Sequence, residues 1–179
     1  MRSRTAEWFE TKIKYEKTME DGLQKKVSEN YAVDALSFTE AEESIIEEMS
    51  AYISGEFDVV DIKKAAYKEI FFSDSPKDDR WYKVKLQFII IDEKSGKEKY
   101  STVNYIVQSN TLQNAVKSIE EVMNTGMQDW KLSAVAETTL MDVFEHGAQN
   151  AKPQRDDKPE YEEDPLAEPT AQEAPATEE

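Results

Sequence analysis

The chain has 179 residues, a formal net charge of −16 at pH 7 and no cysteine. This length allows one domain or two very small ones with a tail, and the lack of cysteine excludes disulfides, thiolate metal sites and cysteine nucleophiles. The N-terminal residues MRSRTAEW contain no apolar stretch and no run approaches a membrane span, so we expect a cytoplasmic protein without a signal peptide.

The first predicted strand begins at Trp8 and alternates between two sets of side chains, as a strand with two different faces does. One face carries Phe9, Thr11, Ile13 and Tyr15, and the other carries Trp8, Glu10, Lys12 and Lys14. The turn TMEDG follows and supplies a glycine for a positive φ, so we expect a hairpin with a second strand that buries Val27, Tyr31 and Val33.

A helix is predicted next. Residues 37–40, SFTE, form a capping box, in which the serine caps the helix and the glutamate reaches back. Apolar residues then recur at helical spacing: Phe38, Ala41, Ile45, Met49 and Tyr52. A last strand is expected over residues 57–71, which completes a β-β-α-β unit.

The same series of elements recurs about 74 residues later. The phrase WFETKIKY at residues 8–15 returns after 73 residues as WYKVKLQF at residues 81–88. A shift of 74, which a one-residue indel reconciles with 73, aligns Asn30 with Asn104 and Ile45 with Ile119. The second helix is expected to begin at NTLQ, residues 110–113, and the last strand to span residues 130–144. We interpret this agreement as an internal duplication.

The duplication predicts the architecture. Neither copy has enough core to fold alone, so we expect the two to pair about a pseudo-two-fold axis into one mostly antiparallel α+β domain with six strands and two helices. The predicted boundaries are residues 6–72 and 80–146 for the copies and residues 147–179 for a tail. Residues 151–179 hold three basic and ten acidic residues and five of the six prolines, which is typical of a disordered segment.

The sequence also resembles a known family. Its signature is WFETKIKYEKTMEDGLQKKVSENYAVDALSFTEAE, with EIF, DRWYKVK and AETTLMDVF further on. Over residues 6–145 it is similar to small proteins of Bacteroidota and their phages that share a domain of unknown function. The resemblance implies a bacterial or phage-infected cell and brings no catalytic residues with it.

No residue pattern predicts an enzyme or a cofactor site. The one histidine, His146, cannot build a triad or a histidine metal site, and no glycine-rich phosphate loop is present. Glu69 and Asp142 occupy equivalent positions and are the best acid–base candidates. We interpret them as structural residues at strand ends, and we expect no catalytic, cofactor or metal residues.

The face of the first strands that carries the tryptophans suggests a binding site. If the helices cover the side of Phe9 and Ile13, aromatic rings and lysines share the other side. Such a face suits single-stranded nucleic acid, since rings stack on bases and ammonium groups neutralise phosphates. The predicted binding residues are Trp8, Lys12, Lys14, Lys26, Trp81, Lys83, Lys85 and Tyr100.

Two other functions stay open. The same tryptophan face could bind a protein partner or a second copy of the chain, because exposed apolar patches often mark interfaces. A strongly acidic small protein could also imitate DNA and block an enzyme that acts on it. The acidic tail fits a regulatory role, in which it competes for the binding face, or simple solubilisation. Binding to membranes is not expected, because such acidic helices are repelled by anionic headgroups.

Overall fold

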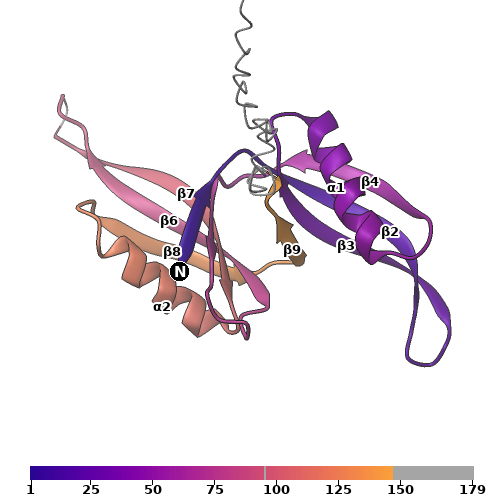
Figure 1. Ribbon diagram of the computed structural model, residues 1–179. Coiled ribbons are helices and arrows are strands. Elements are labelled where there is room, and N and C mark those ends of the chain that lie inside the picture. Colours follow the sequence, from indigo (N-terminus) through magenta and orange to yellow (C-terminus); the bar gives the residue numbers. More distant parts are fainter. Residues whose placement is uncertain (95, 147–179) are drawn as a thin grey trace, which may run out of the picture.

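The chain builds the same series of elements twice (Figure 1), and the computed structural model describes residues 1–94 and 96–146. The strand β1 (Arg2–Thr5) comes before the first series, which is β2 (Trp8–Thr18), β3 (Gln24–Asp34), α1 (Phe38–Tyr52), β4 (Phe57–Lys64) and β5 (Glu69–Phe72). The second is β6 (Arg80–Ile91), β7 (Glu98–Ser109), α2 (Leu112–Met123), β8 (Trp130–Glu137) and β9 (Leu140–Phe144). The predicted tail, residues 147–179, lies outside the described residues.

Local signals place the turns and the helix starts. Gly22 and Gly96 have φ values of 79° and 65°, so both hairpin turns use the freedom of glycine as expected. The Ser37 hydroxyl accepts a hydrogen bond from the Glu40 amide at 3.1 Å, and the Glu40 carboxylate accepts one from the Leu36 amide at 2.7 Å. The second helix is capped by Thr111, one residue later than the expected Asn110.

The strand arrangement differs from the expected six. The described residues form a four-stranded sheet in the order β4-β2-β3-β9 and a five-stranded sheet in the order β1-β5-β7-β6-β8. Each last strand is in fact two, because the chain leaves its own sheet after β4 and after β8. β5 then pairs in parallel with β7 of the second copy, and β9 pairs in parallel with β3 of the first. The copies therefore exchange their final strands.

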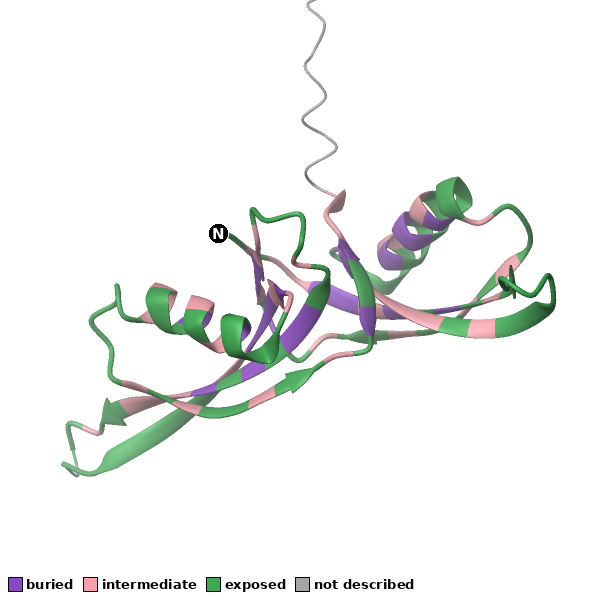
Figure 2. Cartoon of the chain, turned by 90° about the horizontal axis from the view of Figure 1, so that it is seen from below, coloured by how far each residue is buried: buried purple, intermediate pink, exposed green. Residues whose placement is uncertain are grey.

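Each helix covers one face of the sheet beside it. In the first sheet Phe9, Ile13 and Val33 pack against Ile45 and Met49 of α1. In the second sheet the equivalent side chains pack against α2, and this cluster contains Tyr82, Val84, Leu86, Val107, Ala115 and Ile119. The expectation that the helices cover the side of Phe9 and Ile13 is confirmed. Figure 2 shows both helices on one side of the molecule, while the opposite side is formed by strands.

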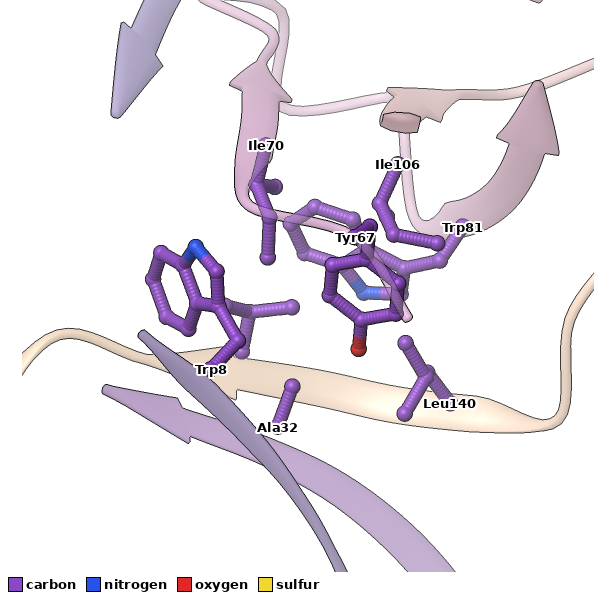
Figure 3. Close-up of a cluster of buried hydrophobic side chains, with 8 residues drawn as sticks. Trp8, Ala32, Tyr67, Ile70, Trp81, Ile106 and Leu140 are labelled. Carbon is purple, nitrogen blue, oxygen red and sulfur yellow. The ribbon is translucent and has the colours of Figure 1, made fainter. Parts of the chain in front are cut away.

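A third cluster joins the two sheets (Figure 3). It brings together side chains from both copies and from both exchanged strands: Trp8, Ala32, Tyr67, Ile70, Trp81, Ile106, Leu140 and Val143. Ile70 comes from β5 and Val143 from β9, so the strand exchange supplies part of the cluster. The two sheets are held together by this apolar contact at the ends of β2 and β6.

The hairpin of the first copy is reinforced by a polar network around Glu29. The hydroxyls of Tyr15 and Tyr31 donate hydrogen bonds to Glu29 Oε2 at 2.9 and 2.7 Å, and Lys17 Nζ lies 3.4 Å from Oε1. Partial burial raises the pKa of Glu29, but the hydrogen bonds from Tyr31 and Tyr15 and the charge of Lys17 outweigh it. The pKa of this carboxyl therefore lies below its ordinary value, and the ionised form stabilises the fold.

Replacing Glu29 with glutamine should lower the free energy of unfolding by about 1–2 kcal/mol at pH 7, because hydrogen bonds to a charged acceptor are lost. A lowered pKa in the folded state means that the stabilisation is present above the ordinary value of 4.5 and disappears as the pH falls through the lowered value. Urea unfolding at neutral and strongly acidic pH measures the difference. Glu16→Gln is the control, since Glu16 makes only an exposed ion pair at 3.9 Å with Lys26. A Glu29→Gln effect that persists unchanged in acid would contradict the assignment.

Candidate functional site

The two tryptophans of the predicted binding face are buried. Trp8 is 1% exposed and Trp81 is 3% exposed, so the prediction that their rings stack on bases is wrong. Trp8 Nε1 donates a hydrogen bond to the Lys68 carbonyl at 3.2 Å, and the Trp81 ring meets Phe72 edge-on at 5.6 Å. They do lie on the side of the strands away from the helices, but there they form the contact between the two sheets. A protein interface built on exposed tryptophans is excluded for the same reason.

Beyond this contact, the strand surface opposite the helices remains open, and we call it the helix-free face of each sheet. On the first sheet it carries Lys12 and Lys14, which are exposed and lie beside Asp61 and Asp58 of β4. Nearby, Lys63 pairs with Glu10 at 2.9 Å and Lys26 pairs with Glu16 at 3.9 Å. The predicted lysines of the first copy are therefore mixed with carboxylates.

The helix-free face of the second sheet has a different character. Lys83 lies between Ile106 of β7 and Ala136 of β8, and Lys85 lies between Asn104 and Ala134. Gln87 and Lys131 are opposite each other one step further along the strands. Among the described residues, no carboxylate forms an ion pair with Lys83, Lys85 or Lys131. These three lysines make an unneutralised cationic surface, which we call the lysine face.

The lysine face includes a shallow depression. Its volume is about 360 Å³, and its lining residues are Lys83, Lys85, Thr102, Asn104, Ala134 and Ala136. On the β8 side the depression is lined by the small side chains of Ala134 and Ala136, so a ligand can reach the ammonium groups of the two lysines from that direction. Thr102 and Asn104 add hydrogen-bonding groups on the β7 side. The arrangement suits an anionic ligand with polar groups of its own.

Tyr100 is the aromatic residue of the predicted site that stays accessible. It is 57% exposed and lies opposite Ile89, on the same side of the sheet as Gln87 and Lys85. Its hydroxyl donates a hydrogen bond to the Glu98 carboxylate at 3.1 Å, and this bond raises the pKa of the tyrosine. The ring is thus held at the outer end of the lysine face, where a base could stack on it.

A family model described as Domain of unknown function (DUF4494) matches residues 7–146. The chain belongs to this family. The match includes both copies, so the DUF4494 domain is the duplicated unit as a whole. The resemblance to a domain of unknown function is confirmed. No curated protein and no solved structure matches the chain.

Within the DUF4494 domain the two helix-free faces differ in charge at equivalent positions. The first copy has Glu10, Lys12, Lys14, Asp58, Asp61 and Lys63, and the second copy has Lys83, Lys85, Gln87, Lys131, Ala134 and Ala136. Three lysines face three carboxylates in the first set, while the second set keeps three lysines and has no carboxylate. The sequence contains this difference. It becomes visible only when β4 and β8 are placed beside β2 and β6.

The two acid–base candidates lie in different sheets. Glu69 lies opposite Tyr105 in the five-stranded sheet, and Asp142 lies opposite Tyr31 in the four-stranded sheet. Over residues 1–94 and 96–146, no group of three or more histidine, aspartate or glutamate side chains could hold a metal ion. In the same residues no helix is long and apolar enough to cross a membrane.

Proposed function

We propose that this DUF4494 protein is a non-enzymatic binding protein whose lysine face takes single-stranded nucleic acid. The observation that carries the proposal is a set of three lysines on an open sheet surface, Lys83, Lys85 and Lys131, for which residues 1–94 and 96–146 supply no carboxylate partner. Lysine is a point charge suited to phosphate oxygens, and phosphate contacts supply most of the affinity of non-specific binders.

The geometry of the strands supports a linear ligand. Lys83 and Lys85 are two residues apart on β6, so their Cα atoms are separated by about 7 Å along the strand. Lys131 and Tyr100 extend the same surface toward the hairpin end, since both flank the β6 segment from Gln87 to Ile89. A strand of nucleic acid could place phosphates on the lysines in succession and one base on the Tyr100 ring.

The overall charge of −16 limits the affinity for nucleic acid and makes it depend on salt concentration. Acidic residues elsewhere repel a polyanion at long range, whereas the lysine face attracts it within about 10 Å at moderate salt. Binding should therefore be modest and strongly salt-dependent. We also propose that residues 147–179 compete for the lysine face, because their sequence holds ten acidic and three basic residues and is itself a polyanion.

Fluorescence anisotropy of a labelled single-stranded oligonucleotide tests the lysine face. Changing Lys83, Lys85 and Lys131 together to alanine should weaken binding at least tenfold at low salt and reduce the slope of log K against log salt by about two. The matched control changes Lys12, Lys14 and Lys26 to alanine, which should leave binding within about twofold, because carboxylates such as Asp58, Asp61 and Glu16 lie beside these lysines. Equal losses from both triple variants would contradict the assignment to the second copy.

The same titration tests the competing tail. A chain that ends at Gln149 should bind more tightly than the full chain, and the difference should shrink as salt rises. Equal affinity of the two chains would leave the tail a solubilising segment. No binding by either chain at low salt would remove nucleic acid and favour a protein partner or a DNA mimic.

A further inference from the structure

We infer that the outer end of the β6–β7 hairpin is a self-association surface on which two copies of this chain pair. We call this end the second arm; it consists of residues 88–91 of β6 and 98–100 of β7. The corresponding end of β2 and β3, residues 15–18 and 24–26, is the first arm. Figure 1 shows both arms reaching beyond the helices, and Figure 2 shows that their ends are exposed.

The second arm ends in apolar side chains that the described part of the chain, residues 1–94 and 96–146, leaves exposed. Ile90 is 52% exposed and Ile91 is 68% exposed, and they end a run of four apolar residues, Phe88 to Ile91. Successive side chains of a strand point to opposite faces, so the run makes both faces of the arm apolar. Such a run is typical of a strand that is covered on both sides.

The first arm shows that the fold itself does not require this pattern. The positions equivalent to Phe88, Ile89, Ile90 and Ile91 are Tyr15, Glu16, Lys17 and Thr18. There, Tyr15 and Lys17 are anchored on Glu29, whose equivalent in the second copy is Val103. The first arm thus carries polar side chains that suit contact with water, whereas the second arm, at the equivalent place in the fold, carries apolar ones.

The second arm also offers a free strand edge. β8 pairs with β6 as far as Phe88 opposite Trp130, and the last contact is the hydrogen bond from the Ile89 amide to the Asp129 carbonyl at 2.9 Å. Past this point, within the residues that the structure describes, β6 pairs only with β7. Free edges of this kind pair readily with a strand from another molecule.

Charge argues that the second molecule is another copy of this chain. Two chains of net charge −16 repel each other over most of their surfaces. Around the second arm, however, Asp92, Glu93 and Glu98 are balanced by Lys94, Lys97 and Lys99, and Lys99 pairs with Asp92. Positive and negative charges therefore balance at this arm, and they are self-complementary between two copies. An antiparallel pairing of two β6 edges would place the same apolar side chains of both copies together, as two-fold symmetry requires.

Cross-linking tests the pairing directly, because the chain has no cysteine of its own. The full-length Ile90→Cys variant should form a disulfide-linked dimer under mild oxidation, at a yield at least tenfold above that of the Lys17→Cys variant. The Lys17→Cys variant is the matched control, since Lys17 holds the equivalent position on the first arm. Similar yields from the two variants would overturn the proposal.

Sedimentation equilibrium of the unmodified chain provides the second measurement. The wild-type chain should show a monomer–dimer equilibrium, and the double variant Ile90→Lys, Ile91→Thr should stay monomeric at every concentration. These are the residues of the first arm, so the fold should tolerate them, and circular dichroism should show an unchanged Tm. The added lysine lowers the net negative charge, so a lost dimer could not be attributed to repulsion. A wild-type chain that is monomeric at every concentration would overturn the inference. It would not affect the proposal that the lysine face binds nucleic acid.

Discussion

Replacing Trp81 with alanine is expected to lower the free energy of unfolding by about 3–5 kcal/mol, the usual cost of truncating a buried tryptophan. Trp81 is 3% exposed and packs with Ile106 and Ile70 where the two sheets meet. Its loss would leave a cavity between the copies that strands from both sheets line. Because small proteins have about 5–15 kcal/mol of stability, this single change removes a large part of it.

Urea unfolding followed by circular dichroism measures the effect. Trp8→Ala should cost a similar amount, since Trp8 holds the equivalent place on the other sheet. Trp130→Ala is the control, because Trp130 is only partly buried at the edge of the α2 cluster, and it should cost clearly less. If Trp81→Ala left stability unchanged and abolished oligonucleotide binding, the tryptophan would be a stacking residue after all.

Much of the local structure could be predicted because each signal depends on neighbouring residues. Alternation along residues 8–15 identifies the side of β2 that holds Phe9 and Ile13, and the helices do cover that side. Ser37 and Glu40 mark the start of α1, and the glycines at 22 and 96 mark the turns. The repeat carries the strand faces and the turn into the second copy, while the start of α2 lies one residue later than predicted, at the Thr111 cap.

The role of the tryptophans could not be predicted in this way. Alternation shows that Trp8 and Lys12 share a face, but it does not show what lies on that face. One end of the face meets the other sheet and the rest meets water, so Trp8 is buried while Lys12 is exposed. A clue was present in the composition, since tryptophan at equivalent positions of two copies fits a contact between them as well as it fits a surface.

Only part of the lysine face could be predicted from the sequence. Lys83 and Lys85 were predicted from β6 alone, and Lys131 was missed because it comes from β8, after the helix. A register shift between Lys85 and Leu86 sets which β8 residues face these lysines. Irregular pairing of this kind leaves little trace in a sequence pattern. The same limit hides Asp58 and Asp61, which lie beside Lys14 and Lys12 in the first copy.

Removing the exchanged strand β9 is expected to have the second large effect on the stability of the fold. A chain that ends after Glu137 should lose cooperative folding, although it lacks only nine of the described residues. β9 contributes Leu140 and Val143 to the contact between the sheets and Phe144 to the core under α1. Losing a buried side chain such as Leu140 costs about 2–5 kcal/mol. With Val143 and the partly buried Phe144 also removed, the total loss approaches the stability of a small protein.

The position of β9 explains why its loss would damage the copy to which it does not belong in sequence. β9 covers the edge of β3, and beyond it Glu145 accepts two hydrogen bonds from Arg2 at 2.8 and 2.6 Å. Without β9 the first sheet ends in an open strand whose apolar residues Ala32 and Val33 lose their neighbour. We therefore expect the first copy to open before the second.

Circular dichroism and urea unfolding compare this chain with one that ends at Gln149, which keeps β9 and should fold like the full chain. Adding a peptide of residues 138–146 to the shorter chain should restore part of the cooperative transition, because the strand can then bind in trans at the β3 edge. If the chain ending after Glu137 unfolded at the same urea concentration as the control, the strand exchange would contribute nothing to stability. The three strands β4, β2 and β3 would then be stable with α1 alone, and the duplication would join two independent units instead of completing each with a strand of the other.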